Sequence, residues 1–215
     1  MKNICMKAMA GLAMASVVTG ADGQVTFNIV ASQSIVDTTV TSSFTLSVFV
    51  EATFGTHIEN AGFDLLYSGP ALAIGDISPG RLPWDTTGSL GSFQTNGDFL
   101  GYSIGQVINP PVFLPDPASS VLGNPVLVGN FIVDLDLFGG VFGTAVWSTA
   151  GGVSGNGAVS IFDQTTGNFM QFRQADPGVI AGSVSVTFVP APSSLGVLGV
   201  GGLVVGRRRR SLLLY

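Results

Sequence analysis

Apolar and polar residues alternate along many short segments of this chain, and a two-residue period is typical of half-buried β-strands. In residues 24–31, for example, Val25, Phe27 and Ile29 alternate with polar residues. Segments of similar character predict further strands at residues 44–50, 61–67, 71–77, 99–104, 126–137, 144–148, 158–162, 169–172 and 183–188. The pattern therefore predicts ten strands in all.

Turn-forming residues separate these strands. Clusters of Gly, Asn, Asp and Ser predict turns at residues 95–98 and 151–157, and the Ser-Pro-Gly sequence at residues 78–80 predicts a break. A Pro-rich stretch at residues 109–117 predicts a long surface loop. No segment shows a helical period long enough to connect parallel strands. We therefore predict an all-β fold, an antiparallel β-sandwich of the Ig-like or jelly-roll class, over residues 24–188.

The charged residues are unevenly distributed along the chain. Of the eight Lys and Arg residues, only Arg81 and Arg173 lie within residues 22–206, which hold all 13 Asp and Glu residues and so carry a net charge of −11. A body this acidic excludes nucleic acid as a partner, because phosphate contacts require several basic side chains.

The single cysteine, Cys5, precedes the body, which therefore has no disulfide. Packing alone must hold this single domain together.

The first 23 residues have the layout of a secretory signal peptide. Lys2 and Lys7 make a positive start, residues 8–18 are mostly apolar, and small residues follow, with cleavage expected near Ala21 or Gly23. The body is therefore expected to be exported.

Residues 189–215 form a tail with three parts. These are the motif Val189, Pro190, Ala191 and Pro192, the apolar segment 195–206, and the arginines Arg207, Arg208, Arg209 and Arg210. As a helix the apolar segment would be about 18 Å long, against a hydrocarbon core of about 30 Å. It is also rich in glycine, so we predict a transmembrane helix that inserts only transiently. Clustered arginines stay on the cytoplasmic side, which leaves the body outside.

The signal peptide, the Pro-containing motif, the Gly-rich apolar segment and the arginine cluster together resemble the PEP-CTERM class of exported bacterial proteins. The resemblance implies recognition by an exosortase-type transpeptidase in the membrane, removal of the tail, and delivery of the body to the cell surface or an extracellular matrix. Two features depart from the class. The motif reads Val-Pro-Ala-Pro where the class has Pro-Glu-Pro, and residues 211–215 extend beyond the arginines.

A second resemblance covers residues 24–80. The alternating strand at residues 44–50, the segment 60–67 (Asn-Ala-Gly-Phe-Asp-Leu-Leu-Tyr) and the segment 76–80 (Asp-Ile-Ser-Pro-Gly) are similar to the opening of cohesin-type and related carbohydrate-binding sandwiches. The usual Asp after the Tyr is absent, since Ser68 stands there. The resemblance therefore implies a cohesin-like sandwich fold and no particular binding residue.

The first candidate site is aromatic. Trp84 lies in a predicted loop with Arg81 and Asp85, where an exposed indole ring could stack on a sugar while the charged neighbours bind hydroxyls. The alternative is a Trp folded over the end of the sandwich. Trp147 lies in an apolar strand and is predicted to be a core residue.

The second candidate site is acidic. Asp134 and Asp136 are two residues apart, so in a strand they share one face, where they could hold Ca²⁺ with loop oxygens or serve a glycosidase if another carboxylate opposed them. The alternative is a polar outer face of an edge strand. His57, the only histidine, is expected to be a solvated loop residue. Asp98, Asp163 and Asp176 lie in turn-like sequence and are expected to bind nearby backbone amides.

Three hypotheses about function remain open. The leading one is an exported, non-enzymatic surface or extracellular-matrix protein, sorted through its tail by an exosortase-type enzyme. The alternatives are a secreted carbohydrate-binding module that binds extracellular polysaccharide, and a secreted polysaccharide hydrolase with an acidic site. No cofactor is predicted apart from the possible Ca²⁺.

Overall fold

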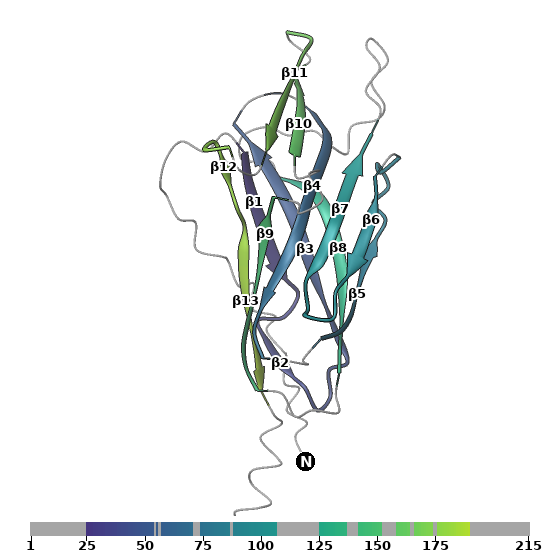
Figure 1. The fold of residues 1–215 in the computed structure, drawn as a ribbon, viewed down its shortest axis with the longest axis vertical. Helices are drawn as coiled ribbons and strands as arrows, with labels where there is room; N and C mark the ends of the chain where they lie inside the picture. The colour runs from purple at the N-terminus through teal and green to yellow at the C-terminus, as the bar shows by residue number, and fades with distance from the viewer. Residues whose placement is uncertain are drawn as a thin grey trace, which may run out of the picture.

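The computed structural model describes residues 25–53, 55, 57–70, 74–86, 88–106, 125–136, 142–151, 158–163, 166–173 and 176–189. Over these ranges the chain forms 13 β-strands and no helix, and the strands make two sheets (Figure 1). Aromatic and aliphatic side chains from both sheets form one hydrophobic core between them. The predicted all-β sandwich is therefore confirmed.

The first sheet contains five strands in the order β12-β1-β3-β8-β5. Their bounds are β1 (Val25–Ala31), β3 (Ser43–Ala52), β5 (Ile74–Gly80), β8 (Val126–Leu135) and β12 (Val179–Ile180). In the central strand β3, the side chains of Phe44, Leu46 and Val48 are buried, and the residues between them are half-buried. A strand that packs one face on a core requires this alternation.

The second sheet contains eight strands. Their bounds are β2 (Ile35–Asp37), β4 (His57–Ser68), β6 (Leu90–Phe93), β7 (Phe99–Gly105), β9 (Gly143–Ala150), β10 (Ala158–Asp163), β11 (Asn168–Arg173) and β13 (Ser183–Val189). The main path runs β11-β10-β4-β9-β13-β2. The sheet branches at the long strand β4. One edge of β4 pairs with β10 near its start and with β9 near its end. The other edge pairs with β7, which in turn pairs with β6.

All ten predicted strands are present, with bounds that differ by a few residues. The pattern does not predict β2, β6 and β12, since two to four residues carry too little periodicity. Two of these short strands also depart from the antiparallel arrangement, because β12 pairs parallel to β1 and β2 pairs parallel to β13. The predicted loop at residues 109–117 lies outside the described residues.

The predicted break at residues 78–80 is wrong, because these residues belong to β5. Pro79 lies directly opposite Phe131 of β8. Proline cannot donate a ladder hydrogen bond, and within sheets it is tolerated on edge strands. Since β5 is the edge strand of the first sheet, the fold accepts a proline that the sequence pattern indicates as a break.

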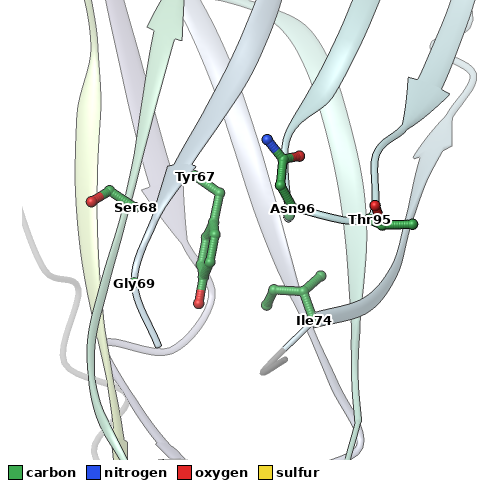
Figure 2. A pocket seen from close by; sticks show the side chains of 7 residues that line it. Tyr67, Ser68, Gly69, Ile74, Thr95 and Asn96 are labelled. Carbon is green, nitrogen blue, oxygen red and sulfur yellow. The ribbon is translucent and has the colours of Figure 1, made fainter. Parts of the chain in front are cut away.

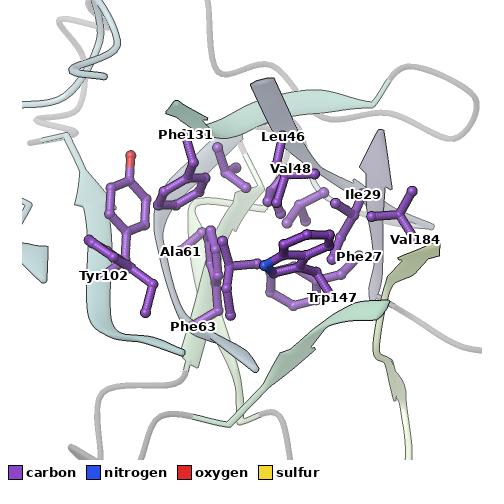
Figure 3. Close-up of a cluster of buried hydrophobic side chains, with 14 of the residues drawn as sticks. Phe27, Ile29, Leu46, Val48, Ala61, Phe63, Tyr102, Phe131, Trp147 and Val184 are labelled. Carbon is purple, nitrogen blue, oxygen red and sulfur yellow. The ribbon is translucent and has the colours of Figure 1, made fainter. Parts of the chain in front are cut away.

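Aromatic rings join the two sheets in the core (Figure 3). The ring of Phe131 in β8 lies 6.0 Å from that of Phe63 and 5.4 Å from that of Phe99, both in the opposite sheet. Trp147 of β9 is fully buried and lies 5.6 Å from Phe44, so its predicted core position is confirmed. Edge-to-face pairs of this kind contribute about 0.5–1.5 kcal/mol each beyond their area burial.

The described chain enters the sandwich at one end and leaves it at the other. Val25, the first residue of β1, lies beside Val179 of β12, shortly before β13 begins. β13 then runs along the second sheet and ends at Val189, beside Asp37 of β2. In Figure 1 this exit is at the lower end of the molecule.

Candidate binding groove

A groove lies between the end of β4, the start of β5 and the turn that joins β6 to β7. Its volume is about 390 Å³, and the lining residues are Tyr67, Ser68, Gly69, Ile74, Thr95, Asn96 and Gly97. The ring of Tyr67 stands on one side, and Asn96, Thr95 and Ile74 lie across from it (Figure 2). Ile74 belongs to the first sheet, whereas Tyr67 and Ser68 end β4 of the second sheet and residues 95–97 lie in the turn between β6 and β7. Only the packed sandwich therefore creates the groove.

Tyr67 is held in place from three sides. Its backbone N–H donates a hydrogen bond to Oδ1 of Asp98 at 2.7 Å, and its hydroxyl donates to the carbonyl of Pro70 at 2.8 Å. Its ring packs on Trp147, with 5.1 Å between the centroids. Burial raises the pKa of the Tyr67 hydroxyl, which therefore stays protonated at neutral pH. The oxygen of this hydroxyl can still accept a hydrogen bond from a ligand.

The turn at residues 94–98 forms the opposite wall, and the predicted turn at this position is confirmed. The N–H of Gly97 donates to the carbonyl of Gln94 at 2.9 Å. The side-chain amide of Asn96 donates to Oδ2 of Asp98 at 2.7 Å, and Oδ1 of Asn96 accepts from the Asp98 N–H at 3.1 Å. These bonds hold the Asn96 side chain in one position beside the groove.

Gly97 allows the turn to approach Tyr67 closely. Its φ of 95° is in the region that L side chains rarely adopt, and a Cβ atom there would lie 2.5 Å from Cδ1 of Tyr67. A larger residue would therefore push the turn away from the ring. The width of the groove depends on this glycine.

None of the seven lining side chains carries a charge. The hydroxyls of Tyr67 and Thr95 and the amide of Asn96 supply hydrogen-bonding groups, while Ile74 and the Tyr67 ring supply apolar surface. The Ser68 side chain points away from the Tyr67 ring (Figure 2). A neutral ligand with several hydroxyl or amide groups fits this combination.

The structure corrects the predicted sugar-binding position of Trp84. This residue is only 7% exposed, and its Nε1–H donates to the carbonyl of Leu127 at 3.3 Å. The ring therefore offers no open face for stacking on a sugar, and Trp84 belongs to the hydrophobic core.

The charged neighbours of Trp84 also have structural contacts. Oδ1 of Asp85 accepts hydrogen bonds from the N–H groups of Gly88 at 2.9 Å and Gly105 at 3.2 Å. Nη1 of Arg81 lies 3.7 Å from Oδ2 of Asp85. Asp85 thus connects the 81–89 segment to the end of β7, and its side chain is 3% exposed.

Asp134 and Asp136 lie on the exposed surface near the end of β8. Asp134 is opposite Asp76 of the edge strand β5, whereas Asp136 follows the last residue of the strand. Asp76 uses its carboxylate locally, accepting from the Ile77 N–H at 2.8 Å and the Ser78 hydroxyl at 3.2 Å. Among the described residues no group of three or more His, Cys, Asp or Glu side chains is placed to hold a metal ion.

The expectation for His57 is wrong. It is the first residue of β4, not a loop residue, and is 8% exposed. It pairs across the sheet with Phe162 of β10, which in turn lies opposite Phe169 of β11. The residues before His57 show no strand periodicity, so the sequence pattern does not predict a strand position for this histidine.

Of the predicted sorting motif, only Val189 is among the described residues, and it ends β13. Pro190, Ala191, Pro192, the apolar segment 195–206 and the arginines 207–210 lie outside them, as does the predicted signal peptide. In the described part of the chain, no helix meets the length and hydropathy needed to cross a membrane.

No pattern in the sequence predicts the groove. Its residues come from three separate segments, and each gives only a turn or strand-end signal: Tyr67 ends an alternating strand, and residues 95–97 belong to a predicted turn. The one available signal is Gly97 in the sequence Thr-Asn-Gly-Asp. It predicts a positive φ but not the contact between this turn and the Tyr67 ring.

No protein-family model matches this chain, and no curated protein matches it in sequence. Solved structures of related fold include the seventh ScaB type I cohesin from Pseudobacteroides cellulosolvens, at 12% identity and a TM-score of 0.47, over 78% of this chain and 92% of that one. A type III cohesin module from the cellulosomal ScaE cell-surface anchoring scaffoldin of Ruminococcus flavefaciens has 12% identity and a TM-score of 0.41, over 83% and 96%.

AvmM, which catalyses macrocyclization in alchivemycin A biosynthesis, has 11% identity and a TM-score of 0.34, over 80% of this chain and 93% of that one. Cohesin modules are the class that residues 24–80 resemble. Similarity at this level carries no binding or catalytic residue over to this chain.

Proposed function

We propose that this protein is an exported, non-catalytic binding module that is displayed at the cell surface or in an extracellular matrix. An exosortase-type transpeptidase sorts it through its tail and cuts the chain near the Val189–Pro192 motif. The signal-peptide layout of residues 1–23 and the arginine cluster at residues 207–210 support export with the body outside.

The place of Val189, the first motif residue, in the last described strand is the observation on which this proposal depends. Val189 is the last residue of β13, where it pairs with Asp37, and its carbonyl accepts the N–H of Thr38 at 3.1 Å. All of the described strand pairs of the sandwich therefore lie before Pro190. A cut after Pro192 would remove the tail without breaking any of these pairs.

Mass spectrometry of the protein recovered from the membrane, the cell surface and the medium tests the proposal. We expect surface and medium fractions to lack peptides that extend beyond the motif, and the double variant Pro190→Ala with Pro192→Ala to retain them. Pro177→Ala is the matched control, because this proline lies in the turn before β12 and outside the motif. Intact tails on exported wild-type protein would show that the tail is an anchor, and whole chains in the cytoplasm would overturn export.

A carbohydrate-binding role is the second candidate, and the uncharged groove beside Tyr67 is the observation that favours it. This groove differs from the position that the sequence indicated at Trp84.

A further inference from the structure

We propose that the groove between Tyr67 and the 95–97 turn binds an uncharged saccharide, such as a segment of a neutral extracellular polysaccharide. The proposal goes beyond export and display, because it assigns a ligand class and a site to the body. Five observations support it: the size of the groove, the chemistry of its walls, the rigidity of Tyr67, the charge of the molecule around it and the position of the groove in the sandwich.

The size and lining of the groove suit a sugar. Its volume of about 390 Å³ is within the range of roughly 300–1,000 Å³ that is usual for small-molecule sites. A sugar ring presents hydroxyls around its edge and C–H groups on its faces. The hydroxyl of Thr95 and the amide of Asn96 match the edge, while Ile74 and the Tyr67 ring match a face.

The aromatic wall is rigid before any ligand binds. The Tyr67 ring is supported from behind by Trp147 and fixed at both ends of the residue by Asp98 and Pro70. Asn96 is likewise held by its two hydrogen bonds with Asp98. These protein groups therefore lose little conformational entropy when a ligand binds, so contacts that are individually weak can still give measurable binding.

The charge of the protein selects among saccharides. The body carries a net charge of −11, yet no charged side chain lines the groove. An acidic polysaccharide would be repelled by the surrounding field and would find no cation in the groove to offset the repulsion. A neutral saccharide experiences no such repulsion.

The position of the groove also fits a polysaccharide of the surface that receives the protein. Ser68 lies beside Val146 of β9, and the start of β9 lies beside the last residues of β13. Because Val146 pairs with Ser185, the groove lies four residues before Val189, where β13 ends (189 − 185 = 4). A body attached through that end would bring the groove close to the matrix.

Calorimetric titration of the purified full-length chain tests the proposal. The probes are neutral tetrasaccharides of glucose, mannose, xylose and galactose, with tetragalacturonate as the acidic comparison. We expect saturable binding of at least one neutral probe, with a change in the fluorescence of Trp147, which contacts Tyr67. We expect the double variant Thr95→Val with Asn96→Ala to bind about tenfold more weakly, because it lacks one hydroxyl partner and one amide partner.

Both substituted residues are exposed, so this variant should fold. Thr187→Val with Asn168→Ala, at two positions outside the groove, makes the same chemical change and should bind like the wild type. The proposal is overturned if no neutral probe binds, if the groove variant binds as tightly as the control, or if tetragalacturonate binds as tightly as the neutral probes. Such a failure leaves the tail-processing result intact, since that result is read from peptides and not from binding.

Discussion

Single carboxylates in this protein act mainly as acceptors for backbone amides. Asp64, which is fully buried in β4, accepts the Gly101 N–H at 2.6 Å. Asp98 accepts the N–H of Tyr67, and Asp176 accepts the N–H of Arg173 at 2.8 Å. Hydrogen bonds to a charged acceptor contribute about 1.5–3 kcal/mol each, so these acids stabilise loops and strand ends. The structural role expected for Asp98 and Asp176 is confirmed.

Asp85 provides a test of this role. We expect Asp85→Ala to lower the free energy of unfolding by about 2 kcal/mol or more, because the Gly88 and Gly105 N–H groups lose their acceptor. Asp85→Asn keeps an oxygen acceptor and should cost less. Arg81→Ala should cost less than about 1 kcal/mol, since its side chain is 61% exposed. Urea denaturation measures all three, and equal losses for Asp85→Ala and Arg81→Ala would contradict the assignment.

Tyr102 makes stability depend on alkaline pH. Burial raises the pKa of its hydroxyl to about 12, the Asp85 carboxylate adds to the shift, and Arg81 opposes it. An unfolded chain releases this proton near pH 10, at about the usual tyrosine pKa. The folded protein therefore binds more protons than the unfolded one between about pH 10 and 12, and the stability present below this window is lost as pH rises through it.

Tyr102→Phe removes this titration. We expect the wild type to lose more stability than the variant between about pH 9 and pH 12, measured by urea denaturation at each pH. Tyrosinate absorbance gives a second readout, because the variant should lack the ionisation step near pH 12. Parallel pH profiles for the two proteins would show that Tyr102 does not hold its proton more tightly in the folded state.

Among the strands, the pairing of β5 with β8 brings two like charges together. Asp76 and Asp134 lie directly opposite each other on the outer face of the first sheet. Like charges in this arrangement are unfavourable by a fraction of a kcal/mol, and more so at low ionic strength. Charged side chains on an edge strand also hinder its pairing with strands of other chains. The negative charge on β5 therefore disfavours aggregation, which offsets its small cost in stability.

Asp134→Asn should raise the free energy of unfolding by about 0.2–1 kcal/mol. Asp136→Asn is the matched control for charge, since Asp136 lies beyond the β8 ladder and should have a smaller effect. Thermal denaturation with and without CaCl₂ measures both. If Ca²⁺ stabilises the wild type and Asp134→Asn abolishes this effect, the carboxylates hold a cation and the repulsion argument is wrong.

β4 shows how far a strand can depart from its sequence pattern. The alternation predicts residues 61–67, but the strand spans His57–Ser68 and bends at two register shifts, opposite Ser160 of β10 and between Phe63 and Leu65. At the second shift Asp64 binds the amide of Gly101, whose φ is 74°. The first and last residues of β4 depend on the strands that pair with its two edges. The alternation within β4 alone therefore does not predict them.

The whole molecule separates its acidic body from its basic ends. The body's negative charge keeps copies apart in solution and away from anionic polymers, while the arginines stay at the far end of the tail. The last described strand, β13, ends at Val189, the first residue of the predicted sorting motif.

Local patterns in the sequence determined the class of fold, the ten main strands, the core position of Trp147 and the turn at residues 95–98. These features depend on period, burial and turn chemistry over a few neighbouring residues. Tertiary structure alone decided that Trp84 is buried, that Pro79 lies within an edge strand, and that Tyr67, Ile74 and Asn96 meet in one groove. Each of these features depends on contacts between segments that are distant along the chain. The spacing of the residues in the sequence does not predict those contacts.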